Sequence, residues 1–186
     1  MLASGSPPRQ ELLLACGYRF DVVRTDVDET PQPGEEPAAY TLRVARAKAD
    51  AAASPGSIVL AADTTVALGG RILGKPADAA EAEAMLADLA GRAHTVYTAV
   101  VACTEAGHRH LTVATVVRFR ALGAAEIRAY VATGDPLDKA GAYGIQGPGG
   151  FLVDRVEGSY PNVIGLPLAE TVALLDTFGV PRAAVP

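Results

Sequence analysis

Apolar stretches of two different periods alternate along the chain, separated by glycine and proline. Residues 57–62 are almost continuously apolar, which predicts a strand buried on both faces. Residues 64–68 and 71–73 flank Gly69-Gly70 and predict a hairpin with a two-residue turn. Residues 95–104 and 108–120 predict a long antiparallel pair around Glu105-Ala106-Gly107. We also expect short strands at residues 1–4, 20–25 and 151–156.

Helical periodicity is clearest in residues 37–53. Leu42, Ala45, Ala49 and Ala52 form a narrow apolar stripe there, and Lys48 lies off that stripe. Capping and breaking residues predict further helices over residues 7–16, 79–90, 124–133 and 168–178. Residues 26–37, which precede the helix at 37–53, are acidic and rich in proline, and we expect them to form a loop. Together the elements predict an α/β protein with a mixed, twisted sheet.

Composition limits the classes of function. At 186 residues and 49% hydrophobic content, we expect residues 1–186 to form a single domain, or two small lobes that share a core. A net charge of −5 argues against nonspecific binding of DNA or RNA, yet it allows a small anionic substrate. Cys16 and Cys103 are far apart and give neither a disulfide framework nor zinc spacing. We therefore expect a cytoplasmic protein with no signal peptide, membrane span or membrane partner.

Residues 139–147, Lys-Ala-Gly-Ala-Tyr-Gly-Ile-Gln-Gly, hold three glycines in nine positions. Such a segment is costly to order and buries little apolar area, but it allows the backbone to approach a neighbour closely. Lys139 adds a charge, and Gln146 adds an amide that can both donate and accept hydrogen bonds. We interpret the segment as a binding loop rather than a structural one.

Two carboxylates are candidates for the chemistry. Asp63 is expected at the end of a buried strand, where an ionised carboxylate is costly unless it meets a metal or a cation. No helix follows that Asp63 could cap, and sites in α/β proteins lie at strand ends. Glu29 belongs to an acidic loop that by itself reads as solvated surface. If Glu29 lies near Asp63, the pair forms a hard oxygen site for Mg²⁺ or Mn²⁺.

Several basic residues could bind phosphate. Residues 69–75 match the start of a P-loop, but Pro76 stands where Ser or Thr should hold a metal, and the glycine pair predicts a hairpin turn. We reject the P-loop and keep Lys75 as a point-charge phosphate ligand. Lys48 and Lys139 are either phosphate ligands or solvated. His108 and His110 alternate on one strand face with no third ligand in view, which predicts surface residues.

The motifs together resemble the Maf family, also called septum formation inhibitor Maf. The matching segments run in order along essentially the whole chain: Ser4-Gly5-Ser6-Pro7, Ala62-Asp63-Thr64, Gly74-Lys75-Pro76, residues 138–147 and Asn162-Val163-Ile164-Gly165-Leu166-Pro167. The run at residues 139–147 is highly specific. The resemblance is to the branch that acts on dTTP and UTP.

The resemblance implies an activity and an architecture. The activity is hydrolysis between the α and β phosphorus of a nucleoside triphosphate, with a divalent cation such as Mg²⁺, Mn²⁺ or Co²⁺. The products are the monophosphate and pyrophosphate, and the implied purpose is removal of modified pyrimidine nucleotides. The implied fold is an elongated, two-lobed, inosine triphosphatase-like domain with the site in the cleft, often as a homodimer.

The resemblance also assigns residues. Asp63 would be the general base or a metal-bound carboxylate, and Glu29 its metal partner. Ser4, Arg9, Lys48, Lys75 and, from the glycine-rich loop, Lys139 would hold the triphosphate, while Thr64 and Gln146 would shape the base pocket. Pro8 departs from the family pattern, which commonly has arginine there. A branch acting on 7-methyl-GTP also has a nonbasic residue at this position, so we expect Pro8 to affect specificity.

Three functions stay open from sequence. The first is the pyrophosphatase, of either base preference. The second is another phosphoanhydride or phosphate-ester hydrolase, which would release orthophosphate. The third is a regulator of cell division that binds nucleotide without turnover.

Overall fold

A six-stranded mixed sheet organises the computed structural model, which describes residues 1–183. Its path is β1-β2-β4-β5-β6, and β3 also pairs with β2. Among the six strands, β1 and β2 pair in parallel and the other pairs are antiparallel. The strands are β1 (Leu2–Ala3), β2 (Val59–Leu68), β3 (Arg71–Leu73), β4 (Ala93–Thr104), β5 (Gly107–Phe119) and β6 (Val153–Glu157). The predicted mixed α/β sheet is confirmed.

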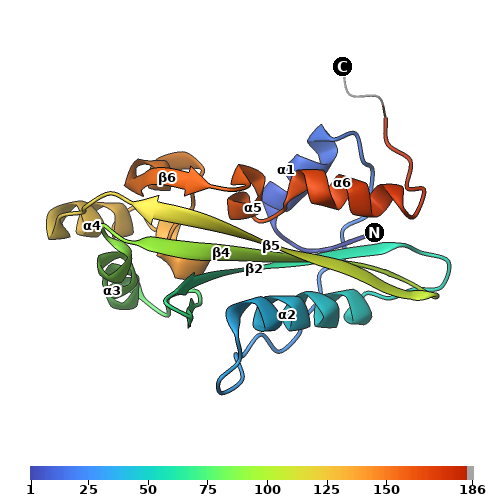
Figure 1. The fold of residues 1–186 in the computed structure, drawn as a ribbon, viewed down its shortest axis with the longest axis horizontal. Coiled ribbons are helices and arrows are strands. Elements are labelled where there is room, and N and C mark those ends of the chain that lie inside the picture. The colour runs from blue at the N-terminus through green and yellow to red at the C-terminus, as the bar shows by residue number, and fades with distance from the viewer. Residues whose placement is uncertain (184–186) are drawn as a thin grey trace.

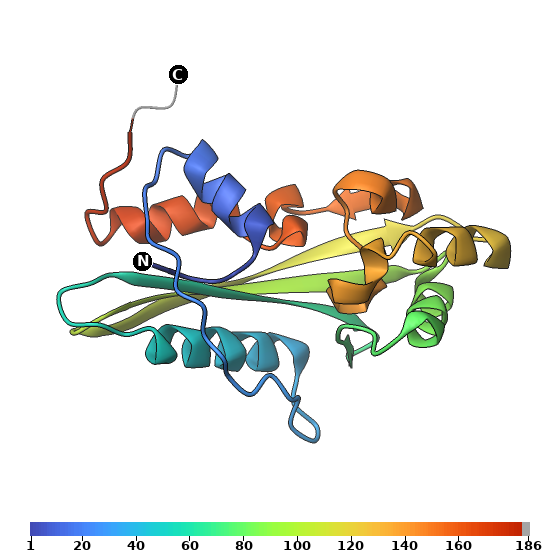
Figure 2. The same ribbon diagram turned by 180° about the vertical axis from the view of Figure 1, so that it is seen from behind.

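Helices cover both faces of this elongated sheet (Figure 1). One face carries α2, the opposite face carries α1, α5 and α6, and α3 and α4 lie toward one end. Figure 2 shows α1 and α6 together above the sheet and α2 below it. The helices are α1 (Pro7–Ala15), α2 (Pro37–Ala51), α3 (Ala79–Leu89), α4 (Ala124–Val131), α5 (Tyr160–Ile164) and α6 (Leu168–Asp176). None of the helices within residues 1–183 is both long and apolar enough to cross a membrane.

Alternate residues of β2 pack into different layers. Leu60 and Ala62 belong to the cluster formed with α1 and α6, whereas Val59 and Ala61 pack against the alanine stripe of α2. This two-residue period follows from the pleat of a strand. Because both sides of β2 are covered, residues 59–62 are apolar on both faces, as residues 57–62 indicated, and the polar residues 63–65 interrupt this pattern.

The sheet has a gap along one edge of β2. β4 pairs with β2 over residues 59–67, so β1 and β3 must share the opposite edge. On that edge, β1 pairs only with Leu60 and Ala61 of β2, and β3 pairs only with residues 66–68. Within the described part of the chain, no strand pairs with residues 62–65 on that edge. This leaves four residues with a free backbone edge between two short strands.

Two sequence predictions are wrong. Residues 20–25 do not form a strand: Val22 makes one isolated bridge to Leu2, because β1 is only two residues long and offers no further partner. Asp63 does not end a strand but lies in the middle of β2, since residues 59–68 form one continuous element. The short helix α5 was not predicted, because its five residues are too few to show a period.

Candidate active site

A cleft of about 980 Å³ opens at the unpaired edge of β2. Neighbouring residues of a strand point to opposite faces, so a cleft at a free edge can reach both layers of the fold. Every candidate from the sequence lines it: Ser4, Pro8, Arg9, Glu29, Lys48, Asp63, Thr64, Lys75, Lys139 and Gln146. The structure therefore brings together residues that are more than 140 positions apart in sequence.

On the α2 side of the sheet, one ammonium group joins two carboxylates. Lys48 Nζ lies 2.7 Å from Asp63 Oδ1 and 2.8 Å from Glu29 Oε1. Only 8% of the Asp63 side chain is exposed, against 48% for Glu29. Lys48 lies on α2 and Asp63 on β2, so the pair also links the helix to the sheet. Glu29 and Asp63 therefore contact the same ammonium group, which is the proximity that a shared metal site would require.

The loop that carries Glu29 is fixed by α2. The Tyr40 hydroxyl donates to the Glu29 carbonyl at 2.8 Å. Arg43 donates to the Thr30 carbonyl at 3.0 Å and forms an ion pair with Glu35 at 2.7 Å. Burial raises the pKa of Tyr40 to about 12, and the charges of Asp63 and Glu29 act in the same direction. Tyr40 therefore stays a neutral donor near two anions.

On the opposite face, Arg9 is a buried guanidinium that joins three segments. It donates to the Gly165 carbonyl at 2.8 Å, to Ser4 Oγ at 3.1 Å and to Thr64 Oγ1 at 2.9 Å. Burial lowers the pKa of Arg9, and the charges of Asp63 and Glu29 oppose that shift. The three bonds use three of the five N–H donors of a guanidinium. Within residues 1–183, two N–H groups of the Arg9 guanidinium therefore remain free to donate hydrogen bonds to an anion in the cleft.

A buried polar network supports the Thr64 end of this cluster. Thr64 Oγ1 lies 2.9 Å from Thr98 Oγ1, and the Thr98 hydroxyl donates to the Asn162 carbonyl at 2.9 Å. The Asn162 amide donates in turn to the Val96 carbonyl and to Thr115 Oγ1, at 3.1 and 3.0 Å. The sequence matched Asn162 to a motif but gave it no role. Its long-range partners, on β4 and β5, could not be read from sequence.

The glycine-rich segment does approach a neighbour closely, and that neighbour is β2. A Cβ at Gly141 would lie 2.9 Å from Val66, and the φ of Gly141 is +68°. Its N–H donates to the Gly74 carbonyl at 3.0 Å, which holds the glycine-rich segment beside Lys75. Ala142 has a φ of 57°, a strained value for a residue with a side chain. Glycine is thus required at position 141 by packing inside the protein.

The two lysines of this region differ in their surroundings. Lys139 forms ion pairs with Asp138 at 2.8 Å and Asp135 at 3.2 Å. Hydrogen bonds and charge from these two aspartates outweigh burial and raise the pKa of Lys139. Lys75 is exposed, and none of the ion pairs found within residues 1–183 involves it. Lys75 can therefore bind a phosphate without first breaking an ion pair with a carboxylate.

Sequence reasoning missed the support beneath this segment. Tyr143 is buried, and its hydroxyl lies 2.8 Å from His94 Nε2. His94 and Phe119 also pack edge-to-face on each other, with ring centroids 4.9 Å apart. Burial lowers the pKa of His94 to about 4, so the imidazole is neutral at physiological pH. An isolated histidine at the start of a strand gives no signal of this role.

Gln146 and Pro8, both expected from sequence to affect specificity, line the cleft. Gln146 is exposed and precedes Gly147, where φ is +72°. Pro8 is half-buried in the first turn of α1, next to Arg9. Because proline has no side-chain donor and no N–H, this turn offers an anion fewer hydrogen bonds than one with arginine.

Comparisons with known proteins show which family the chain resembles. The sequence model of the family described as Maf-like protein matches residues 1–178. A dTTP/UTP pyrophosphatase from Myxococcus xanthus is 58% identical over 183 residues, covering 97% of this chain and 93% of the relative. Proteins of the same name from Anaeromyxobacter dehalogenans (strain 2CP-C) and Cupriavidus metallidurans are 55% and 48% identical. These two alignments cover 97% and 96% of this chain, and 94% and 96% of the relatives.

Proposed function

The chain belongs to the Maf-like protein family, and we propose that it is a dTTP/UTP pyrophosphatase acting in the cleft at the edge of β2. Relatives with that name align over nearly the whole chain. The observation that carries the proposal is the convergence of Asp63 and Glu29 on Lys48 Nζ, opposite the Arg9 cluster. Carboxylates and cations are thus gathered at one place, as a metal-bound triphosphate requires.

The two carboxylates suit a divalent cation. Both already bind one positive charge, the ammonium of Lys48, so their oxygens face a common point. Mg²⁺ and Mn²⁺ prefer carboxylate oxygens and commonly take one or two from the protein, together with substrate phosphates. We assign Asp63 and Glu29 to holding such an ion. When bound, the ion would neutralise phosphate charge and stabilise the leaving pyrophosphate.

The reaction needs a base and several cations. We assign Asp63 to accept the proton of the attacking water, whose oxygen bonds to the α phosphorus. The bond from that phosphorus to the α–β bridging oxygen breaks, and pyrophosphate leaves with the bridging oxygen. We assign Arg9, Lys48 and Lys75, with Ser4 and Lys139, to hold the triphosphate. In the transition state, negative charge builds up on the phosphate oxygens, and these groups stabilise that charge most strongly.

Base preference is assigned to Gln146 and Thr64. An amide such as that of Gln146 can donate to O4 of uracil or thymine and accept from N3–H. Thr64 already bonds to Arg9 and Thr98, so it positions the phosphate-binding arginine as well as lining the cleft.

We further propose that the enzyme is cytoplasmic, works as a homodimer and uses no nucleic acid or membrane partner. Light scattering of the purified chain would measure the oligomeric state.

Product analysis tests the proposal directly. UTP, dTTP, 7-methyl-GTP and modified pyrimidine triphosphates are incubated with Mg²⁺, Mn²⁺ or Co²⁺, and pyrophosphate and orthophosphate are measured separately. We expect pyrophosphate and a monophosphate, with UTP and dTTP preferred, and no turnover in EDTA. Orthophosphate as the first product would identify a different phosphohydrolase. Tight nucleotide binding without turnover under all three metals would identify a regulator.

A further inference from the structure

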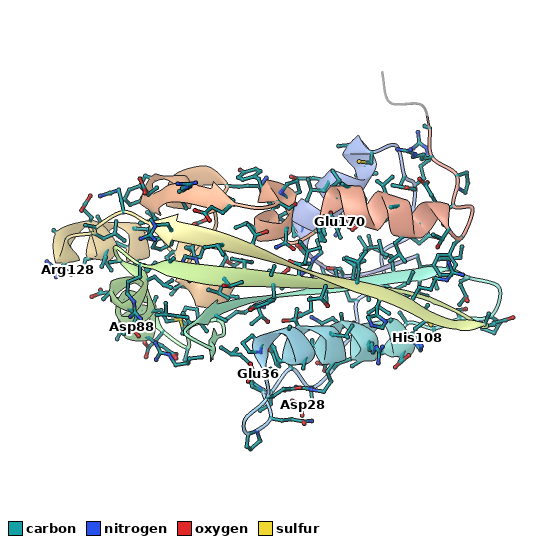
Figure 3. All side chains as sticks on the ribbon, in the orientation of Figure 1. Asp28, Glu36, Asp88, His108, Arg128 and Glu170 are labelled. Carbon is teal, nitrogen blue, oxygen red and sulfur yellow. The ribbon has the colours of Figure 1, made fainter. Side chains whose placement is uncertain are left out.

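A second cluster of metal-ligating side chains lies away from the cleft. Asp50, Cys103 and His108 each offer one ligand atom, and these atoms all lie within 4.8 Å of one another. None of the three lines the cleft. Cys103 pairs with Val59, four residues before Asp63 on β2, which corresponds to about 13 Å along the strand. Figure 3 shows His108 near the sheet end where β4 and β5 are joined, beside the end of α2.

The fold explains why these residues meet. Cys103 and His108 are directly opposite in the β4–β5 pair, so their side chains share one face of the sheet. Cys103 packs with the alanines of α2, which places that face under the helix. Asp50 lies in the last turn of α2, and its Oδ1 is 2.6 Å from His108 Nε2. The expectation that no third ligand lies near His108 is therefore wrong, because α2 and β4 supply two.

The neighbouring histidine provides an internal comparison. His110 shares the strand and face of His108, since it pairs with Val101 of the same cluster. One turn earlier on α2, however, stands Arg46, whose guanidinium lies 3.1 Å from His110 Nδ1. A cation beside His110 opposes metal binding, whereas a carboxylate beside His108 favours it. The two histidines thus differ in the charge that α2 places against them.

We propose that Asp50, Cys103 and His108 bind a transition-metal ion, with Zn²⁺ as the best match, and so clamp the end of α2 to the β4–β5 hairpin. One thiolate, one imidazole and one carboxylate form a ligand set that suits Zn²⁺, leaving one position for water. Neighbouring ligand atoms around tetrahedral Zn²⁺ stand about 3.3 to 3.6 Å apart. The His108–Asp50 contact must open by less than about 1 Å to meet that spacing. On binding, the proton of the Cys103 thiol leaves to solvent.

A second cavity gives access to the Cys103 thiol, whereas burial of this thiol is a cost that a bound cation must offset. Cys103 is 6% exposed and lines a second cavity of about 240 Å³, together with residues 53–55 and Glu105. Burial raises the pKa of the Cys103 thiol, and the negative charge of Asp50 adds to that effect. A cation would reverse this by stabilising the thiolate.

Cobalt spectroscopy of the reduced, full-length protein tests the site. Co²⁺ bound to a thiolate absorbs in the near ultraviolet by charge transfer. We expect this band to correspond to one thiolate-bound Co²⁺ per chain, apart from any Co²⁺ in the cleft, and to disappear when Zn²⁺ displaces the Co²⁺. His108→Ala and Asp50→Asn each change an exposed residue. Each should lower Zn²⁺ affinity by at least roughly 10- to 100-fold, which is the effect of losing a residue that only hydrogen-bonds to a metal ligand. Cys103→Ser should abolish the band. Zn²⁺ should also raise the Tm of the wild type but not of these variants.

Three control variants isolate the cluster. Cys16→Ser removes the other cysteine, and His110→Ala removes the histidine on the same strand face. Asp63→Asn alters the catalytic cleft, so the band should persist in it even if the proposed pyrophosphatase chemistry is wrong. All three should retain the cobalt band. Absence of the band from the wild type, its loss in Cys16→Ser, or an unchanged metal affinity in His108→Ala and Asp50→Asn would overturn the proposal.

Discussion

Lys48 Nζ lies 2.7 Å from Asp63 Oδ1 and thus holds the carboxylate that we assign as the base. Asp63→Asn keeps nearly the same shape but removes the negative charge. We expect kcat to fall by about 10²-fold or more, as the loss of a general base or metal ligand does. Steady-state hydrolysis of UTP and dTTP measures the change, and circular dichroism checks the fold.

The equivalent change at Asp50 is the control for that prediction, because Asp50 also contacts a basic side chain, that of His108, but lies outside the cleft. Asp50→Asn should leave kcat within a few-fold of the wild type. Near-normal turnover in Asp63→Asn would show that the carboxylate is not part of the chemistry.

The exposed amide of Gln146 should discriminate among bases. Gln146→Glu removes the donor, because an ionised glutamate can only accept hydrogen bonds. Uracil and thymine then lose a partner for O4, whereas guanine presents two donors that a carboxylate can accept. We expect kcat/KM for UTP and dTTP to fall more than for a guanine nucleotide, by on the order of 1–3 kcal/mol in transition-state free energy.

Gln32→Glu adds the same charge at a residue that does not line the cleft, and it should not change the base preference. Equal losses for all bases in Gln146→Glu would assign Gln146 to phosphate binding or to support of the loop instead.

Pro8 and Arg9 should separate specificity from general binding. Pro8→Arg adds a fork of donors at the start of α1, so we expect a lower KM for UTP or dTTP, or a sharper preference for them over 7-methyl-GTP. Arg9→Ala removes the bonds to Ser4, Thr64 and Gly165 and should raise KM several-fold for every triphosphate. Steady-state kinetics on the three nucleotides measures both. An unchanged substrate profile in Pro8→Arg would mean that Pro8 only stiffens the helix entry.

His94 should make the protein less stable in mild acid. Its pKa in the folded protein is about 4, below the usual 6.5, so the unfolded chain binds more protons between these values. The free energy of unfolding therefore falls as pH drops through 6.5. A shift of this size corresponds to roughly 2 kcal/mol lost between pH 7.5 and pH 5.

Urea unfolding at both pH values checks the His94 prediction. His94→Phe should be less stable at pH 7.5, because the buried Tyr143 hydroxyl loses its partner, but should lose less stability on acidification. His110→Ala, at an exposed histidine, should keep the wild-type pH dependence. Equal slopes for wild type and His94→Phe would contradict the assignment.

Patterns within one element were predictable from sequence, and contacts between elements were not. The period of residues 37–53 predicted α2 and placed Lys48 off its apolar stripe, as the structure confirms. The side chains that Lys48 meets depend on the register of β2 against α2, which no local pattern encodes. One prediction within an element also failed: Asp63 was expected at a strand end because the apolar run stops at residue 62, although β2 continues for five more residues.

The supporting residues of the site are the clearest example. Asn162 and His94 are buried polar residues whose partners lie 47 or more positions away in sequence. Single polar residues in apolar segments have many possible explanations, and only the fold selects one. The cluster of Asp50, Cys103 and His108 was likewise hidden, because its members come from a helix and two strands.

The free edge of β2 at residues 62–65 also bears on how well the protein resists aggregation. An unpaired edge in a sheet is a template on which a strand from another molecule can add. Here the flanking side chains Asp63 and Lys48 are charged, and both are costly to bury against a foreign strand. The groups that we assign to catalysis therefore also disfavour pairing of a strand from another molecule with this edge of β2. Replacing both with apolar residues should yield a protein that precipitates more readily when concentrated, apart from any loss of turnover.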